Sequence, residues 1–554
     1  MARWLPLLEP EADVVSELAR VTGADALCAR VLANRGVVPE AAADFLSPSL
    51  KTIGAPEGGA WLVAARRAVR AINNGERIGI FGDYDADGIT SAAVLCVALS
   101  RYTNNLMVKL PTRQTGYGLL EPYVRDLFAE GVNLLITADC GISNRAEIEL
   151  ANTLGMDVIV TDHHIPPEDP PDTAVAVLDP KLWDPKDPLA GVGVAWKFAL
   201  AVAKEIEDPD RKRHLGRLLD FVSIGTIVDI APLVGDNRAL ACMGLRHINR
   251  SLRARSIRPG IGALVKVAGV KDALNEEDLG WKLGPRLNSI GRIKNPRPAL
   301  DLLLTDDRRE ALQIASLLNR LNSERQLRTR YAVERALAEV NPEEDFKVVV
   351  TEEIGGFAGL VAGKIAGAVG RPVAVLNRRT DGSYAGSARS GETDVDLYGA
   401  LFRVRHLLGG WGGHRKAAGF SISPGNFDAF VSGVNEAVRA QLEENPELFT
   451  PPIKVDAELS VKDISNGFLD WHERLAPFGS GNCRPVFVAE GLRIDGARQL
   501  WEGMNLLRLR GGISAKLAGP EGTVPAGAFE AAYTVSRNAY TGAAELEIID
   551  WKTG

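Results

Sequence analysis

Short apolar runs that end in acidic loops and lead into helical segments recur through the first half of the chain. The runs are RIGIF (77–81), NLLITA (133–138), DVIVT (157–161) and AVAVL (174–178). They are followed in turn by GDYDADG, DCG, DHH and DPK, and the first loop leads into the helical stretch ITSAAVLCVALSR. Strands that alternate with helices predict an α/β fold with a mostly parallel sheet covered by helices.

Acidic and histidine side chains stand at the ends of these runs. The carboxyl ends of the strands in an open parallel sheet share one edge, so residues far apart in sequence converge there. FVSIGTIVDIAPL (221–233) is interpreted as a further apolar strand of this kind, which brings its aspartate to the same edge. The residues expected to converge are Asp83, Asp85, Asp87, Asp139, Asp162, His163, His164 and Asp229.

The composition of this cluster predicts a metal centre. Three aspartates within five residues repel one another unless a cation lies among them. Oxygen ligands with one or two imidazoles suit Mn²⁺ or Mg²⁺ better than zinc or copper. Adjacent residues point in different directions, so one of His163 and His164 can bind metal while the other faces a substrate. Two ions roughly 3.5–4 Å apart would activate a water for attack on phosphorus. Hydrolysis of a phosphoester or pyrophosphate is therefore the predicted reaction.

The first acidic loop has a simpler interpretation when it is taken alone. Asp-x-Asp-x-Asp-Gly is often a calcium loop or a plain turn. An EF-hand loop that began at Asp83 would need a glutamate at its twelfth position, which is Val94. The full set of acidic segments, in this order, favours the catalytic metal centre.

The length of 554 residues exceeds one compact core, so several domains are expected. Short helices are predicted in a lead-in segment, and a stretch free of Gly and Pro predicts one long helix that links two lobes. A second α/β pattern follows, and then short strands and turns typical of an OB-fold barrel. The predicted divisions are 1–55 (lead-in), 56–305 (first α/β domain), 306–342 (helix), 343–443 (second α/β domain) and 452–554 (OB-fold).

Composition excludes several classes of protein. The five cysteines show no C-x-x-C spacing, so neither a disulfide framework nor a structural zinc site is expected. The start of the chain does not resemble a secretory signal, and no run of about 18 apolar residues predicts a membrane span. A cytoplasmic protein is expected. The net charge of −7 argues against a protein that coats nucleic acid, although a local basic channel would suffice for a nuclease.

Four segments resemble the metal-site motifs of the DHH phosphoesterase family and, within it, of the bacterial RecJ branch. They are GDYDADG (82–88), ADCG (138–141), DHH (162–164) and GTIVDIAPL (225–233). The likeness extends over nearly the whole chain. It includes GVVPEAAADFLSPSL near the start, PTRQTGYGL (111–119), LAGVGVAWK (189–197), GPRLNSIGRI (284–293), LNSERQ (321–326), GSARS (386–390), GGWGGHRKAAGF (409–420) and LAPFGSGNCRPVF (475–487). The resemblance implies DHH and DHHA1 lobes joined by a long helix, with a C-terminal OB-fold.

The resemblance also implies roles for single residues. It makes Asp85, Asp87, Asp139, His163 and Asp229 metal ligands for two Mn²⁺ or Mg²⁺ ions, and Asp83 a further ligand or a close neighbour of one. His164 would touch the scissile phosphate, so His164, Asp85 and Asp87 are the expected catalytic residues. The family usually has a Trp-His-Pro-Gly stretch in its second lobe, whereas this chain has EEIGGFAGLVAGKI (352–365).

The implied activity is a 5′-to-3′ exonuclease that degrades single-stranded DNA to 5′-mononucleotides in DNA repair and recombination. Basic and polar residues near Gly-rich stretches suit a path for phosphates. Trp411, within one such stretch, favours a core position over base stacking. The expected DNA-binding residues are Arg113, Tyr117, Arg286, Asn288, Arg292, Ser387, Arg389 and His414.

Two other functions stay open at this point. One is a DHH phosphodiesterase for short oligonucleotides or cyclic dinucleotides, and the predicted extra C-terminal domain argues against it. The other is a non-catalytic scaffold that binds single strands, which would be free to lose the metal ligands that are all present here. The expected partners are a DNA strand with a 5′ end and, as the family implies, a single-strand-binding protein and a helicase. A monomer with no membrane contact is expected.

Overall fold

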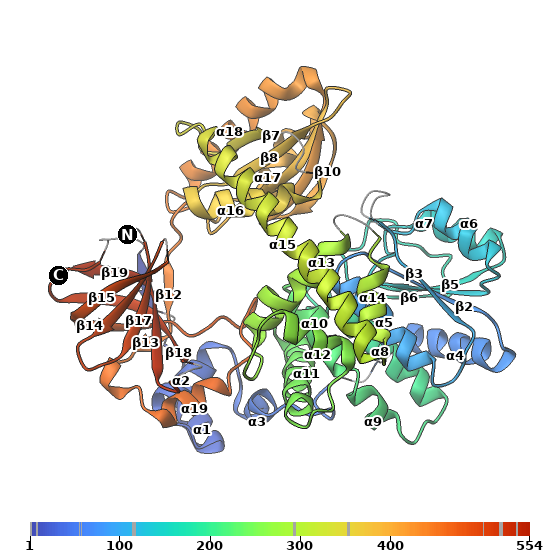
Figure 1. Cartoon of the computed structure of the whole chain (residues 1–554), viewed down its shortest axis with the longest axis horizontal. Helices are drawn as coiled ribbons and strands as arrows, with labels where there is room; N and C mark the ends of the chain where they lie inside the picture. Colours follow the sequence, from blue (N-terminus) through green and yellow to red (C-terminus); the bar gives the residue numbers. More distant parts are fainter. Residues whose placement is uncertain are drawn as a thin grey trace. The chain divides into compact units, whose positions relative to one another are not determined.

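The computed structural model describes residues 3–6, 9–54, 56, 58–112, 118–291, 295–351, 355–501, 503–519, 524–538 and 541–553. The chain divides into two compact units, and Figure 1 labels their elements. The larger unit comprises Pro10–Asn322 and Gly467–Arg484. The smaller unit comprises Met1–Glu9, Ser323–Asn466 and Pro485–Gly554. The long helix α15 (Arg308–Ala338) begins in the larger unit and ends in the smaller one, where the sequence predicts a long helix.

A five-stranded parallel sheet forms the centre of the larger unit, as predicted. Its order is β3-β2-β4-β5-β6, and the register pairs Gly82 with Ala138 and Thr161 with Leu178. The carboxyl ends of β2, β4 and β5 therefore lie at one edge. The strands are β2 (Ile78–Gly82), β3 (Leu106–Lys109), β4 (Leu134–Ala138), β5 (Asp157–Thr161) and β6 (Ala176–Leu178).

Helices cover both faces of this sheet because alternate strand residues point to opposite sides. Leu134 and Ile136 join one core with α4 (Gly59–Asn74), α5 (Ala86–Leu99), α8 (Gly191–Glu205) and α10 (Leu219–Val228). Leu135 joins a second core with α6 (Glu121–Ala129) and α7 (Arg145–Thr153). Burial on both faces explains why these strands read as continuous apolar runs rather than as alternating ones.

Helices make up the rest of the larger unit. The first group is α1 (Ala12–Thr22), α2 (Ala26–Asn34), η1 (Pro39–Ala41) and α3 (Ala42–Leu46), where short helices are predicted. The others are η2 (Pro180–Leu182), α9 (Arg211–Gly216), α11 (Gly235–Arg253), α12 (Pro259–Val267), η3 (Asp278–Leu283), α13 (Gly284–Gly291), α14 (Arg297–Leu304) and, beginning at the boundary of the smaller unit, α19 (Asn466–Glu473).

The smaller unit contains a mixed five-stranded sheet in the order β10-β11-β9-β8-β7, in which only β7 and β8 run parallel. Its strands are β7 (Lys347–Thr351), β8 (Val373–Arg378), β9 (Tyr384–Arg389), β10 (Leu408–His414) and β11 (Ala417–Ile422). Its helices are η4 (Gly355–Phe357), α16 (Ala358–Val369), α17 (Leu397–Arg403), η5 (Arg405–Leu407), η6 (Pro424–Asn426) and α18 (Phe427–Glu444).

A seven-stranded, mostly antiparallel sheet follows in the order β13-β14-β18-β19-β17-β16-β15. Its strands are β13 (Ala457–Glu458), β14 (Phe487–Leu492), β15 (Ile494–Trp501), β16 (Met504–Leu509), β17 (Ser514–Ala518), β18 (Phe529–Arg537) and β19 (Ala544–Thr553), with η7 (Val461–Asp463) after β13. The predicted class of two α/β lobes and a C-terminal β-domain is confirmed.

The start of the chain belongs to the smaller unit rather than to the lead-in helices. β1 (Trp4–Pro6) pairs in parallel with β12 (Ile453–Val455). The Trp4 indole donates a hydrogen bond to Asp550 at 2.9 Å, and Lys552 lies 4.0 Å from the centre of its ring. Across the described ranges, no helix is both long and apolar enough to cross a membrane.

Candidate metal centre

The first acidic loop is a tight connection between β2 and α5. Asp85 is the N-cap of α5, and its carboxylate accepts a hydrogen bond from the Gly88 amide at 3.1 Å. A Cβ on Gly88 would lie 2.5 Å from the Asp83 nitrogen, so only glycine permits this close turn. The turn brings Asp83, Asp85 and Asp87 to the carboxyl edge of the sheet.

Asp87 is almost completely buried, with 1% of its surface exposed. Its carboxylate accepts hydrogen bonds from the amides of Gly191 and Val192, both at 2.9 Å, at the amino end of α8. The partial positive charge at a helix N-terminus favours a carboxylate there. A Cβ on Gly191 would lie 2.4 Å from an oxygen of Asp139, and one on Gly225 would lie 2.9 Å from an oxygen of Asp87. These two glycines leave the room that the carboxylates occupy.

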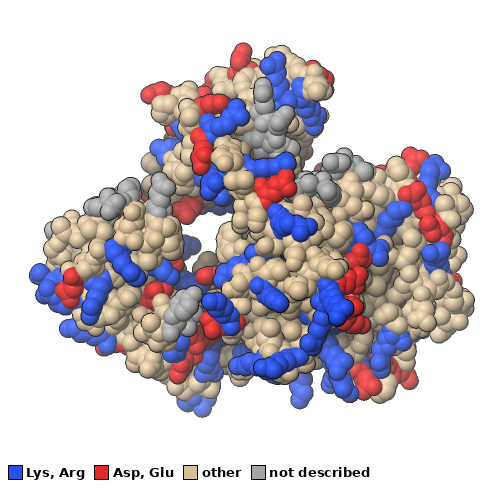
Figure 2. All heavy atoms as spheres, viewed as in Figure 1, with Lys and Arg blue, Asp and Glu red and all other residues tan. Residues whose placement is uncertain are grey.

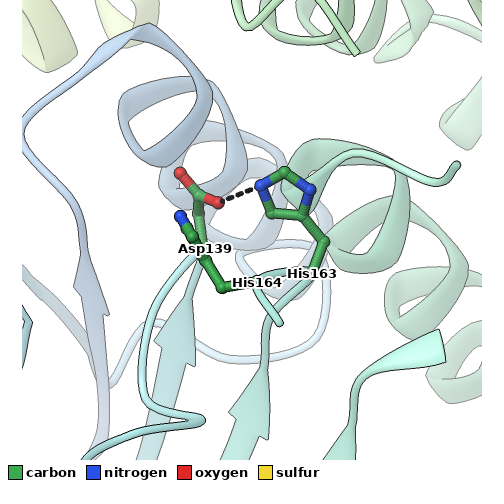
Figure 3. Close-up of side chains that lie close together, drawn as sticks. All are labelled: Asp139, His163 and His164. Carbon is green, nitrogen blue, oxygen red and sulfur yellow. Dashed lines mark ion pairs between the residues drawn. The ribbon is translucent and has the colours of Figure 1, made fainter. Parts of the chain in front are cut away.

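Asp139 follows β4 in the left-handed region of backbone conformation, with φ of 65°. Its amide donates to Thr161 at 2.9 Å, which fixes the backbone at the sheet edge. Its carboxylate points toward the ring of His163, as Figure 3 shows, and an oxygen lies 3.1 Å from Nε2. A non-glycine residue held at positive φ is a typical sign of strain at a functional site.

Asp162 organises the two histidines. One of its oxygens accepts from the amides of His163 and His164, at 2.7 and 3.2 Å, and contacts Nδ1 of His164 at 2.8 Å. The other oxygen accepts from the Ile142 amide at 2.9 Å. Burial alone would raise the pKa of Asp162, but the hydrogen bond and charge of His164 hold that pKa below its ordinary value. Asp162 is therefore an anion that orients His164.

The two adjacent histidines have opposite electrostatic states. Burial, together with the charge of His164, lowers the pKa of His163 to about 3, so its imidazole is neutral and can ligate a metal. Burial opposes protonation of His164 as well, but the hydrogen bond and charge of Asp162 raise its pKa to about 9. His164 is therefore a cation at neutral pH. The different roles expected for the two histidines stay a prediction, and the contact of His164 Nδ1 with the Asp162 carboxylate is the cause of their different pKa values.

The remaining carboxylates are crowded and desolvated. Burial and then the charge of Asp85 raise the pKa of Asp87 to about 7. Burial, followed by neighbouring aspartates, holds the pKa values of Asp83, Asp139 and Asp229 well above the ordinary range. Such repulsion is relieved when a cation lies among the carboxylates.

The side chains fit divalent metal ions. Among the described residues, one buried oxygen of Asp83 and one of Asp139 have no hydrogen-bond partner, and the Asp139 oxygen lies 3.1 Å from Nε2 of His163. Three groups of side chains could each hold a metal ion, because the possible ligand atoms within each group lie within 4.8 Å of one another. The groups are Asp139 with His163 and His164, Asp87 with His163 and Asp229, and Asp83 with Asp85 and Asp139.

The expectation that Asp229 follows a strand is wrong. The apolar run before it forms the helix α10, and Asp229 is the C-cap of that helix. Its carboxylate nevertheless reaches the sheet edge, where it lies 3.9 Å from Nε2 of His163. The run is buried on every side between α5, α8 and α11, and this all-round burial removes the helical periodicity from the sequence.

Residues on the DPK segment after β6 also lie beside the site, although no role is predicted for them from the sequence. Asp179 is fully buried, and burial followed by the charge of Asp162 raises its pKa to about 7. The Lys181 ammonium donates to the carbonyl oxygen of His163. This segment directly follows a strand, as the acidic segments after β2, β4 and β5 do, and that position could have identified it.

The expected DNA-binding residues that the structure describes lie on α13 and on the first sheet of the smaller unit. Asn288 on α13 accepts a hydrogen bond from the Ala86 amide at 2.7 Å, so it directly supports the metal loop. Arg286 on the same helix donates to Asn319 at 3.0 Å, against α15. Ser387 on β9 pairs with Gly419, while Arg389 and His414 both pair with Ala417, so the three share one face of the smaller unit's first sheet. Arg113, Tyr117 and Arg292 lie outside the described residues.

Trp411 packs on aromatic rings rather than standing alone. Its ring centre lies 5.0 Å from that of Tyr398 and 6.2 Å from that of Phe402, both on α17. Trp411 is only half-buried at the edge of the core, and Tyr398 and Phe402 are exposed, so its core position stays a prediction.

Comparisons with known proteins agree with this geometry. Family models match residues 77–226 (DHH family, N-terminal domain), 347–440 (DHHA1 domain) and 455–552 (RecJ OB domain). The chain is 35% identical to the single-stranded-DNA-specific exonuclease RecJ of Bacillus subtilis, over 90% of this chain and 63% of that protein. It is also 35% identical to the Escherichia coli protein of the same name, over 75% of both chains.

Solved structures are similar over the whole chain. RecJ of Thermus thermophilus in complex with Mn²⁺ matches with a TM-score of 0.83 and 29% identity, covering 100% of this chain and 80% of that one. Its complex with Mg²⁺ matches with a TM-score of 0.78 and 27% identity, covering 78% of that chain.

The raised carboxyl pKa values predict how Mn²⁺ stabilises the protein at different pH. A carboxyl whose pKa is raised by folding stabilises the metal-free protein below about pH 4. That contribution is lost as the pH rises through the folded pKa, which is about 7 for Asp87. Mn²⁺ competes with these protons, so it should raise the unfolding temperature more at about pH 8 than at about pH 5. Thermal unfolding with and without Mn²⁺ measures this, and equal shifts at both pH values would contradict it.

The close contact at Gly191 predicts a selective loss of metal affinity. Gly191→Ala places a methyl group 2.4 Å from the present position of an Asp139 oxygen and must displace that carboxylate. Mn²⁺ affinity should fall by about 10–100-fold, the usual cost of disturbing the support of a metal ligand. Gly59→Ala is the matched control, because a methyl group there has no atom within 4 Å. Calorimetric titration with Mn²⁺ measures both variants, and equal affinities would show that the site tolerates the methyl group.

Proposed function

The chain belongs to the RecJ family of single-stranded-DNA-specific exonucleases, and on this basis we propose that it removes 5′-mononucleotides from the 5′ end of single-stranded DNA. The observation that carries the proposal is the buried set of carboxylates around His163, in a chain that matches the DHH, DHHA1 and RecJ OB domains. The proposed cellular role is in DNA repair and recombination.

The cofactor we infer is a pair of Mn²⁺ or Mg²⁺ ions. The proposed ligands are Asp83, Asp85, Asp87, Asp139, His163 and Asp229. Oxygen-rich donors with one neutral imidazole support these ions over zinc or copper. When bound, two divalent ions supply an activated water and neutralise charge on the reacting oxygens.

The chain's own residues prepare the site for a phosphodiester. The amides of Gly191 and Val192 hold Asp87 in one orientation, so its carboxylate needs little reorganisation. Asp162 keeps His164 protonated, and we assign the His164 imidazolium to the scissile phosphate, where negative charge develops. His163 stays neutral and available as a ligand.

Recognition of the 5′ end is proposed for the smaller unit. Ser387, Arg389 and His414 share a sheet face, and an arginine beside a hydroxyl suits a terminal phosphate. Gly359 on α16 leaves room for the Arg389 guanidinium, because a Cβ there would lie 2.5 Å from its Nη2. Arg286, Asn288, Arg292, Arg113 and Tyr117 are proposed to line the strand's path.

Further proposals rest on the family alone. We propose that the OB-like sheet adds affinity for single strands, and that a single-strand-binding protein and a helicase act with this enzyme. A cytoplasmic monomer is proposed. The domain limits 56–305, 343–443 and 452–554 are proposed as well.

The alternatives are less well supported. A phosphodiesterase for short oligonucleotides or cyclic dinucleotides has no evident use for the C-terminal sheet. A non-catalytic scaffold would have no reason to keep several buried carboxylates against mutual repulsion.

An exonuclease assay tests the proposed activity. A 3′-labelled single-stranded DNA incubated with Mn²⁺ should shorten stepwise and keep its label. Asp139→Asn should slow this by more than about 100-fold, since even supports of a metal ligand are worth 10–100-fold. A 5′-labelled strand should release labelled mononucleotide at once. If the strand binds but never shortens, the scaffold is the better assignment, and cleavage of only the shortest oligonucleotides would favour the small-substrate enzyme.

The charge of His164 predicts an alkaline limit to activity. If the imidazolium contacts the phosphate, kcat falls as the pH rises through the pKa of His164, which is about 9 in the metal-free site and lower once cations neutralise Asp85 and Asp229. His164→Gln should lower kcat by about 10²–10³-fold and leave Mn²⁺ affinity nearly unchanged. The variant's residual activity should lack this alkaline limb. A pH profile of kcat measures both effects, and an identical limb in the variant would remove His164 from the assignment.

A further inference from the structure

Basic side chains gather on the larger unit around α9 and the carboxyl end of α11. Figure 2 shows Lys and Arg side chains along the lower edge of the part that carries these helices in Figure 1. The whole chain has a net charge of −7, so this concentration is a local feature. We call it the basic surface, and its arginines are Arg213, Arg217, Arg250, Arg253, Arg255 and Arg258.

A cavity of about 680 Å³ opens within the basic surface. Arg217, Arg250 and Arg258 line it, together with His214 and His247. Its acidic lining residues are Asp220 and Asp306. A cavity of this size can accept a nucleotide-sized group.

Arg258 is held by an ion pair, whereas the charges of Arg217 and Arg250 are not paired within the described residues. Its guanidinium pairs with the buried Asp220 at 2.7 Å, donates to the Arg217 carbonyl at 3.2 Å, and lies 4.6 Å from the centre of the Phe221 ring. Arg217 and Arg250 are exposed, and neither forms an ion pair within the part of the chain that the structure describes. The cavity therefore has an excess of positive charge.

Burial and nearby positive charges lower the pKa values of both histidines. Burial lowers the pKa of His247, and the charges of Arg258, Arg250 and Arg217 lower it further against the opposing effect of Asp220. Burial and the charge of Arg101 likewise lower the pKa of His214, whose buried Nε2 has no hydrogen-bond partner. A neutral imidazole among these arginines still has one N–H that can donate a hydrogen bond to a phosphate oxygen.

We propose that the basic surface binds phosphate groups of the DNA strand at a second site, away from the metal centre. The proposal rests on the proposed exonuclease function. α10 separates the two sites: the cavity lies at its amino end, beside Leu218 and Asp220, and Asp229 caps its carboxyl end. Its 10 residues span about 15 Å at 1.5 Å per residue. Only a strand longer than a few nucleotides can reach both.

The surface suits a nucleic acid better than an acidic protein. The anchors of protein interfaces are mostly aromatic side chains and arginine. The exposed large hydrophobic side chains in 205–290 are Ile230, Val234 and Trp281, and none of them lines the cavity. Phosphates need only charge and hydrogen-bond donors, and arginine supplies both in a bidentate geometry.

The test compares long and short substrates with the Mn²⁺-loaded enzyme. The variant is Arg217→Gln with Arg250→Gln, and the matched control is Lys51→Gln with Lys271→Gln, which removes the same charge from exposed lysines elsewhere on the larger unit. For a long single strand at low salt, the variant should lower kcat/KM by about 10-fold, mainly through KM. The slope of log kcat/KM against log salt should become shallower by about 1.4, which is about 0.7 for each lost phosphate contact.

Two further readouts decide the outcome. For an oligonucleotide of about 2 nucleotides, which is shorter than the single-strand site sizes of about 4–16 nucleotides and too short to reach the basic surface from the metal centre, variant and wild type should have the same kcat/KM. Equal losses on both lengths would indicate a change at the metal centre and overturn the proposal. No loss on the long strand would also overturn it, and would leave free phosphate or an acidic partner as the occupant. If the wild-type enzyme degrades neither substrate, the proposed function itself has failed.

Discussion

Mutual repulsion of buried carboxylates is the constraint on which the larger unit depends. Asp83, Asp87 and Asp139 lie at one sheet edge with almost no exposure to water. Burial and neighbouring charges raise the pKa of each. The fold offsets part of this cost with the amides at the start of α8, and a divalent cation would offset the rest. A site with this much unfavourable charge has a clear physical use only when it holds metal.

The backbone around the site is arranged to bring these groups together. Parallel register aligns the ends of β2 and β4, while Asp139 adopts a positive φ to aim its carboxylate. Gly88, Gly191 and Gly225 lie where any side chain would strike an aspartate or its supports. The glycines in the motifs around the acidic residues are thus needed for close packing at the same site.

The sequence predicts this site well because strand, loop and charge are local signals. It predicts the parallel sheet and the acidic loops after β2, β4 and β5, whereas the ligand set remains a prediction. The prediction is wrong at Asp229, because a helix that is buried on all sides has the same continuous apolar sequence as a buried strand. The supporting role of Asn288 and the basic surface depend on contacts between segments distant in sequence. Arg217 and Arg250 lie 33 positions apart and line one cavity because α10 packs against α11.

One helix links the metal centre to the basic surface electrostatically. The peptide dipoles of α10 give its amino end partial positive charge and its carboxyl end partial negative charge. Asp229 caps the negative end, which adds to the demand for a cation there. The cavity lined by Arg217 and Arg258 lies at the positive end, which adds to its preference for an anion. Because residues Leu219–Thr226 are buried, the helix cannot shift without disturbing the core, and it therefore fixes the separation of the two sites.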